Sequence, residues 1–155
     1  RGNDPGSGNM DPLHSRCIRS LAKLLSLYPG CEFTFASPEE LRMSDELRTL
    51  LHKRGVATRE VHRLEEAIDP DTDIIYMNRL QEERFSNPDD FQRLRKAFVL
   101  TAKHLKNRKA LVMSPLPRVD EIDVNVDSTK NAMYFDEARN GVPVRMAVLK
   151  KCVLS

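Results

Sequence analysis

The amino-acid sequence predicts an α/β fold in which a parallel β-sheet lies between two layers of helices. Short apolar runs typical of strands alternate along the chain with segments of helical periodicity. Strands that alternate with helices favour parallel pairing with right-handed crossovers, which places helices on both faces of the sheet. Residues 73–77 form a compact apolar run, as expected of a strand buried on both faces. At 155 residues the chain is long enough for one domain with its own core.

Helices are expected wherever apolar side chains recur at three- and four-residue steps between a capping residue and a stop signal. Residues 13–28 show this pattern and end at Pro29 and Gly30. A second helix is expected to begin after Ser44 and to end at Gly55, a typical cap and a typical stop. The same signals predict further helical segments over residues 37–40, 64–68, 88–97, a short stretch after Thr101, 130–139 and 143–154.

Strands are expected over residues 31–36, 56–63, 73–77, 98–100 and 111–113. No strand precedes the first helix, although a sheet of this kind normally begins with one. Either the sheet is one strand short, or residues 1–9 pair with it. These nine residues are rich in Gly, Asn, Asp, Ser and Pro and lack apolar periodicity, which is typical of an expression-tag remnant. The domain is therefore expected to cover residues 10–155.

The composition excludes several classes of protein. Hydrophobic residues make up 40% and charged residues 31%, and the net charge is +2 without a basic stripe, so no nucleic-acid or membrane surface is expected. The three cysteines, an odd number without close spacing, indicate free thiols in a reducing compartment, which we take to be the cytoplasm. His14 and Cys17 lack a second pair of ligands, so neither a metal nor a cofactor is predicted.

Two loops are the candidate ligand-binding segments. In parallel α/β sheets, ligands bind where loops leave the carboxyl ends of the strands. One such loop, residues 78–85, follows the predicted strand 73–77, and the other, residues 114–122, follows the strand 111–113. Both loops are rich in polar residues or prolines and are longer than a simple connection between a strand and a helix needs to be.

The motifs in these loops resemble one enzyme family. Residues 79–84 read Arg-x-Gln-x-Glu-Arg, residues 115–122 read Pro-Leu-Pro-Arg-Val-Asp-Glu-Ile, and residues 140–147 read Asn-Gly-x-x-x-Arg-x-Ala. This ordered set resembles the second domain of aspartate carbamoyltransferases, and the resemblance extends over nearly all of residues 11–155. It implies the Rossmann-like aspartate/ornithine-binding fold of carbamoyltransferases. The motifs of the family's carbamoyl phosphate-binding domain are absent from this sequence.

The resemblance also implies an aspartate site, because guanidinium groups grip carboxylates with two hydrogen bonds. The family's aspartate-holding arginine and glutamine fall on Arg79 and Gln81, and a second arginine at the start of the first helix falls on Arg16. Leu116 matches a residue whose backbone carbonyl helps to orient the substrates. We expect these four residues to form an aspartate site, either retained or vestigial. The residues alone also allow a simpler interpretation of both arginines. Arg79 would then form an ordinary ion pair with an acidic neighbour, and Arg16 would be a solvated residue at the start of its helix.

Four other charged residues of these loops are expected to brace the backbone. Glu83 and Arg84 are expected to form an ion pair that orders the first loop, and Arg118 and Asp120 to brace the proline turn of the second. None of them is expected to be catalytic.

The sequence departs from the family pattern at positions that matter for catalysis. The residue before Pro-Leu-Pro is usually histidine and is Ser114 here, and the lysine after the glutamine is Glu82, whose charge opposes a dianionic ligand. Asn78 replaces a threonine, and Arg19 a histidine. Because the carbamoyl phosphate domain is also missing, we expect a truncated, catalytically inactive pseudoenzyme. The alternatives are an excised half of an active enzyme of pyrimidine biosynthesis, or a protein-interaction module that uses the former interdomain surface.

The last predicted helix bears on the expected partners. In the family it crosses onto the missing domain, so its apolar residues would be exposed here, and such patches usually become interfaces. We therefore expect residues 143–154 either to fold back onto their own domain or to exchange between protomers of a homodimer. The expected partners are L-aspartate, bound weakly, and a second copy of the chain.

Overall fold

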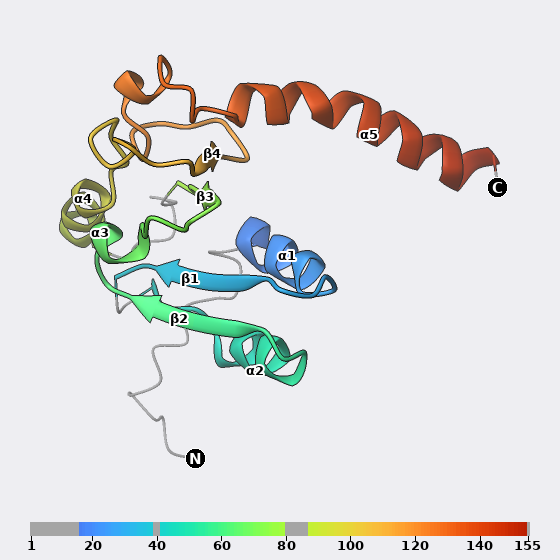
Figure 1. The fold of residues 1–155 in the computed structure, drawn as a ribbon, viewed down its shortest axis with the longest axis horizontal. Coiled ribbons are helices and arrows are strands. Elements are labelled where there is room, and N and C mark those ends of the chain that lie inside the picture. The colour runs from blue at the N-terminus through green and yellow to red at the C-terminus, as the bar shows by residue number, and fades with distance from the viewer. Residues whose placement is uncertain (1–15, 39–40, 80–86, 155) are drawn as a thin grey trace. The chain divides into compact units, whose positions relative to one another are not determined.

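The computed structural model describes residues 16–38, 41–79 and 87–154 (Figure 1). The helices in these ranges are α1 (Arg16–Leu25), α2 (Asp45–Lys53), α3 (Leu64–Ala67), α4 (Pro88–Ala97), α5 (Tyr134–Leu154) and the 3-10 helix η4 (Val124–Val126). The strands are β1 (Glu32–Ala36), β2 (Ala57–Val61), β3 (Ile74–Tyr76) and β4 (Leu111–Met113). The chain divides into two units, the first made of residues 1–67 and 80–98 and the second of residues 68–79 and 99–155.

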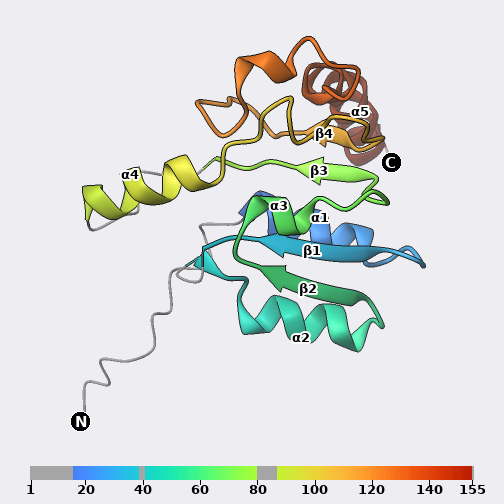
Figure 2. The same cartoon turned by 60° about the vertical axis from the view of Figure 1, so that its left-hand side comes forward.

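The first unit is built on the parallel pair β1–β2, whose register runs from Glu32 opposite Ala57 to Ala36 opposite Val61. Helices α1 and α2 supply most of its core, together with β1 (Figure 2). The buried apolar cluster contains Ala22, Phe35, Met43, Leu47 and Leu51. Removing these side chains from water stabilises the unit at about 25 cal/mol per Å² of apolar surface.

The ends of α1 and α2 are tied together by Arg54. Its Nη1 donates to the Ser26 hydroxyl at 2.6 Å and to the Lys23 carbonyl at 2.8 Å. The guanidinium therefore satisfies a carbonyl at the end of α1, where backbone acceptors lack helical partners. In α4, Asn87 accepts a hydrogen bond from the backbone N–H of Asp89 at 3.0 Å and so caps a helix that begins with a proline.

The second unit is built on the parallel pair β3–β4, in which Ile74 lies opposite Leu111 and Tyr76 opposite Met113. Two further parallel bridges, Leu100 with Ile122 and Val112 with Ala132, join the connecting segments to this pair. The fully buried side chains of the unit include Leu100, Val112, Ile122, Val126 and Tyr134. Asn131 is buried as well, and its amide donates to the carbonyls of Ala110 at 2.7 Å and Arg108 at 3.2 Å.

The predicted α/β class with parallel strands is confirmed. The helix 88–97 coincides with α4, and the segments 31–36, 56–63, 73–77 and 111–113 contain β1 to β4. Ser44 occupies the cap position of α2 as expected, but its side chain makes no capping hydrogen bond. The question of a strand before α1 concerns residues 1–15, which lie outside the described part of the chain.

Four local predictions were wrong. The strand expected over residues 98–100 is reduced to a single parallel bridge between Leu100 and Ile122. No helix follows Thr101, because the ring nitrogen Nδ1 of His104 accepts the Thr101 backbone N–H at 3.0 Å and the segment closes into turns. Strand β3 is not buried on both faces, since Ile74 is 50% exposed and its partner Leu111 is 40% exposed. The two helices expected over residues 130–139 and 143–154 are one helix, α5, which continues through Pro143. A proline removes one helical hydrogen bond and favours a kink there, but the turns on either side keep theirs.

Gly55 shows why a glycine is favoured directly after a helix. It follows α2 with φ +71°, and a Cβ built there would meet no atom within 4 Å, so only the backbone penalises a side chain. We expect Gly55→Ala to lower the free energy of unfolding by about 1 kcal/mol in urea titrations. The matched control is Gly141→Ala inside α5, where alanine is the better helix former and stability should hold or rise. Equal effects at both glycines would contradict the argument.

Candidate functional site

The candidate site lies at one edge of the β3–β4 pair. The two strands are parallel and end side by side, with Tyr76 opposite Met113 and the backbone N–H of Met77 donating to the Met113 carbonyl at 2.9 Å. The loops predicted to bind a ligand therefore leave the sheet at the same edge, which is the usual position of a ligand site in parallel α/β proteins. Arg79, two residues beyond Met77, is half-buried there.

The other residues of the expected aspartate site are distributed differently. Leu116 lies in the loop after β4, in the same unit as Arg79. Arg16 is the first residue of α1 in the other unit, and its side chain is exposed. Gln81, Glu82, Glu83 and Arg84 fall within residues 80–86, outside the described residues. The structure thus brings Arg79 and Leu116 to one sheet edge.

The backbone of the second loop is held in an unusual conformation. Leu116 has φ +47°, a left-handed value that costs a residue with a Cβ on the order of 1–2 kcal/mol. The peptide bond from Leu116 to Pro117 is cis. The hydroxyl of Ser114 accepts a hydrogen bond from the Leu116 backbone N–H at 3.4 Å, which helps to hold the turn in this conformation. Such backbone strain is found most often where a carbonyl or side chain must be aimed at a ligand.

Ser114 itself is committed to the loop. It is 3% exposed, and its backbone N–H donates to Oε2 of Glu137 at 2.9 Å. Both of its polar groups therefore have partners within the second unit, which leaves the side chain poorly placed to serve a ligand. Ser114 thus serves to hold the loop after β4.

Glu121 closes the far end of the loop. Its Oε2 accepts the backbone N–H groups of Val119 at 3.0 Å and Asp120 at 3.2 Å, so the carboxylate holds the loop by its backbone. The residue is 7% exposed, and within the described part of the chain its Oε1 has no hydrogen-bond partner. No local pattern in the sequence indicates this role for Glu121, although a buried carboxylate needs hydrogen-bond donors.

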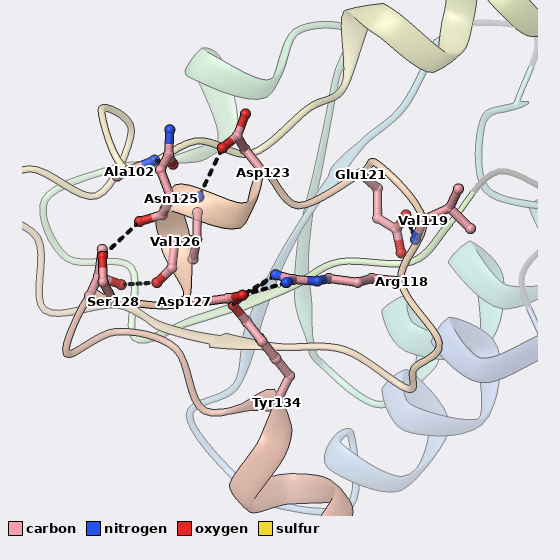
Figure 3. A network of polar contacts seen from close by, with 11 residues as sticks. Ala102, Arg118, Val119, Glu121, Asp123, Asn125, Val126, Asp127, Ser128 and Tyr134 are labelled. Atoms are coloured by element: carbon pink, nitrogen blue, oxygen red, sulfur yellow. Dashed lines mark hydrogen bonds and ion pairs between the residues drawn. The ribbon is translucent and has the colours of Figure 1, made fainter.

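Arg118 is the centre of a polar network (Figure 3). Its two terminal nitrogens each reach an oxygen of Asp127 at 2.5 Å, and its Nη1 donates to the Tyr134 hydroxyl at 3.1 Å. The Tyr134 hydroxyl in turn donates to Asp127. The guanidinium also lies 5.3 Å from the centre of the Tyr134 ring and 5.9 Å from that of Phe135, within the range of a cation–π interaction. The loop is thus fastened to η4 and to the start of α5.

The network fixes the charges of its members. The hydrogen bond from Arg118 lowers the pKa of Asp127 below its usual 3.8, and the same bond raises the pKa of Arg118. Burial, followed by the hydrogen bond and negative charge of Asp127, raises the pKa of Tyr134 to about 12. Near neutral pH the arginine is a cation whose charge is matched by an adjacent carboxylate. Arg118 is therefore a bracing residue and a poor anchor for a ligand carboxylate.

Asp127 and Tyr134 were not assigned this role from the sequence. They lie nine and sixteen residues from Arg118 along the chain, so no local spacing indicates the contact. Among the described residues, no group of three or more His, Cys, Asp or Glu side chains is arranged to hold a metal ion. The described helices include none that meets the length and hydropathy required to cross a membrane.

The network should carry measurable stability. Asp127→Asn leaves a mostly buried guanidinium without its charge partner, and we expect the free energy of unfolding to fall by about 1–3 kcal/mol. Tyr134→Phe keeps the ring and loses one hydroxyl, so the expected loss is about 1 kcal/mol. Urea titration measures both, with Asp71→Asn at an exposed turn as the control that should change little. An Asp127→Asn effect no larger than the control would refute the bracing role.

The pKa shifts predict how stability depends on pH. A carboxyl whose pKa is lowered by folding stabilises the fold above pH 3.8, and that contribution is lost as the pH falls through the lower folded value. A tyrosine whose pKa is raised from 10.0 to about 12 stabilises the fold fully below pH 10, and this is lost as the pH rises towards 12. We expect Tyr134→Phe to flatten the alkaline fall and Asp127→Asn the acid fall. Unchanged pH profiles of the free energy of unfolding in both variants would contradict the assignment.

Comparisons with known proteins give the site its context. The family model for the aspartate/ornithine carbamoyltransferase Asp/Orn-binding domain matches residues 10–152. The aspartate carbamoyltransferase catalytic subunit of Methanobrevibacter smithii is 41% identical over 138 residues, which cover 89% of this chain and 43% of the relative. That of Methanosphaera stadtmanae is 43% identical over 143 residues, which cover 92% of this chain and 46% of the relative. The chain therefore spans somewhat less than half the length of these curated relatives.

Solved structures agree with this. The catalytic subunit of M. jannaschii aspartate transcarbamoylase superposes with a TM-score of 0.84 at 37% identity, covering 89% of this chain and 46% of that one. Aspartate transcarbamoylase from Trypanosoma cruzi in complex with carbamoyl phosphate and aspartate superposes with a TM-score of 0.76 at 32% identity, covering 86% of this chain and 45% of that one.

Proposed function

The chain belongs to the aspartate/ornithine carbamoyltransferase family, and we propose that it is an aspartate-binding half-site that does not transfer a carbamoyl group by itself. The observation that carries the proposal is the extent of the match. Residues 10–152 correspond to the Asp/Orn-binding domain, whereas less than half of each catalytic-subunit relative is covered.

Arg79 is the residue we propose to hold L-aspartate. It follows β3 at the sheet edge where the loop after β4 also begins. Arg118, in that second loop, is neutralised by Asp127. A guanidinium can grip a carboxylate with two parallel hydrogen bonds, which a lysine cannot reproduce. The carbonyl of the strained residue Leu116, in the same unit as Arg79, is the second proposed contact.

The absence of catalysis follows from the chemistry of the reaction. Joining two substrates depends on holding them together and on stabilising the charge that develops between them. This chain matches the Asp/Orn-binding domain. Ser114, at the position where the resemblance expects a histidine, is buried and hydrogen-bonded within its own loop. These features support a pseudoenzyme of the cytoplasmic pyrimidine-biosynthesis family. The partial coverage of the relatives equally fits the second candidate, one half of an active enzyme.

Calorimetric titration with L-aspartate tests the half-site. We expect weak binding that Arg79→Ala reduces at least tenfold and Arg79→Lys reduces less, because a charge-assisted hydrogen bond contributes about 1.5–3 kcal/mol. Arg139→Ala is the matched control, since Arg139 is an exposed arginine paired with Asp136 on α5. No binding by a folded sample, or equal loss in both alanine variants, would refute the aspartate site.

The same samples decide the question of activity. Incubation with carbamoyl phosphate and L-aspartate should give no carbamoyl aspartate above the uncatalysed rate. Product formation that Arg79→Ala abolishes would overturn the claim of inactivity. Activity that appears only when a carbamoyl phosphate-binding half is added would favour the second candidate, half of an active enzyme.

A further inference from the structure

The first turn of α5 is held beside the end of β4 (Figure 1). The backbone N–H of Met133, just before α5, donates to the Val112 carbonyl at 2.9 Å, and the N–H of Val112 donates to the Asn131 carbonyl at 2.7 Å. The N–H of Glu137 then donates to the Met133 carbonyl at 2.8 Å, which is a bond of the first helical turn. This register with β4 places Glu137 next to Ser114, with which the loop after β4 begins.

The side chain of Glu137 accepts a hydrogen bond from this loop. Its Oε2 accepts the backbone N–H of Ser114, a residue that is 3% exposed, at 2.9 Å. The Ser114 hydroxyl in turn accepts the Leu116 N–H at 3.4 Å. Because Pro115 and Pro117 carry no N–H, these two bonds satisfy every backbone donor at the start of the loop. The shorter bond, whose acceptor is a carboxylate, is the stronger of the two.

Two residues of α5 hold the loop at two points. Tyr134 contacts Arg118. Glu137 contacts Ser114, four residues earlier in the loop, and lies on the same face of the helix as Tyr134. Further along α5 every residue over 142–153 is exposed, so the expected folding of this segment onto its own domain is not observed. Exchange of the segment between protomers stays a prediction.

The conformation of Leu116 depends on this support. Its φ of +47° is left-handed, and a residue with a Cβ keeps such a conformation only where its surroundings hold it. The Leu116 N–H is held by Ser114, whose own N–H is held by Glu137. The Leu116 carbonyl, the second proposed aspartate contact, is therefore aimed by a chain of two hydrogen bonds that begins at Glu137.

We propose that Glu137 is a positioning residue for the candidate aspartate site, which fixes the direction of the Leu116 carbonyl through Ser114 without touching the ligand. This role rests on the proposed aspartate binding, because the ligand meets the chain of hydrogen bonds only at Leu116. The chain of bonds itself can be measured without a ligand.

Glu137 also has a simpler role, which two variants separate from positioning. An acid in the first turn of a helix interacts favourably with the helix dipole. Glu137→Asp keeps this charge but is one methylene shorter, so it no longer reaches Ser114. Glu137→Gln loses the charge but keeps an oxygen of the same reach. Asp136→Asn is the matched control, because Asp136 lies in the same turn and pairs with Arg139 of its own helix.

Amide hydrogen exchange of the whole chain without aspartate tests the contact. Glu137→Asp should speed the exchange of the Ser114 amide at least about tenfold, and that of Leu116 by a smaller factor, because a bond to a charged acceptor is lost. Glu137→Gln should keep most of the protection, and Asp136→Asn should change neither amide. Unchanged exchange in Glu137→Asp, or equal losses in Glu137→Gln and Asp136→Asn, would overturn the positioning role in favour of the dipole.

Calorimetric titration of the same samples with L-aspartate tests the link to the site. Glu137→Asp should weaken binding several-fold, whereas Glu137→Gln and Asp136→Asn should stay within about twofold of the wild type, because the loop remains preorganised in both. Aspartate binding that is unchanged in Glu137→Asp would refute the positioning role alone. A folded wild type that binds no aspartate would refute the aspartate site, and with it the role of Glu137, even if the exchange of Ser114 responds as expected.

Discussion

Arg118 and Asp127 form a bidentate ion pair. The Arg118 guanidinium also lies over the rings of Tyr134 and Phe135 in the first turn of α5. The loop after β4 passes directly through this pair, so its strained residue Leu116 is positioned by contacts made two residues further on. The pair also neutralises one of the two arginines described near the sheet edge. The pair thus commits the Arg118 side chain to holding the loop after β4.

The remaining chemistry follows from the pairing of β3 with β4. Because the strands are parallel and in register, the loops that begin at Asn78 and Ser114 share an edge. The side-chain oxygens of Ser114 and Glu121 accept backbone N–H groups of Leu116, Val119 and Asp120, which holds the second loop at its two ends. A loop fixed in this way is preorganised, and a preorganised loop loses little entropy when a ligand binds. Ser114, which is buried, serves the same loop that it helps to hold.

Local patterns in the sequence predicted local structure well. The helix expected from Pro88, and the helix end expected at Gly55, are boundaries that the structure confirms. Predictions failed where distant contacts decide the outcome. Nothing near Arg118 indicates that Asp127, nine residues away, is its partner, and no local signal shows that Ile74 is half exposed. Pro143 was interpreted as a helix boundary, because its local effect is to break a hydrogen bond, yet α5 continues through it.

Amide chemical shifts recorded during an L-aspartate titration show whether the β3–β4 edge binds this ligand. We expect saturable shifts at Arg79, Ser114, Leu116 and Arg118, at the ends of the two strands. Little change is expected along residues 142–153 of α5. Saturable shifts elsewhere with none at this edge, or no shifts at millimolar aspartate in a folded sample, would contradict it.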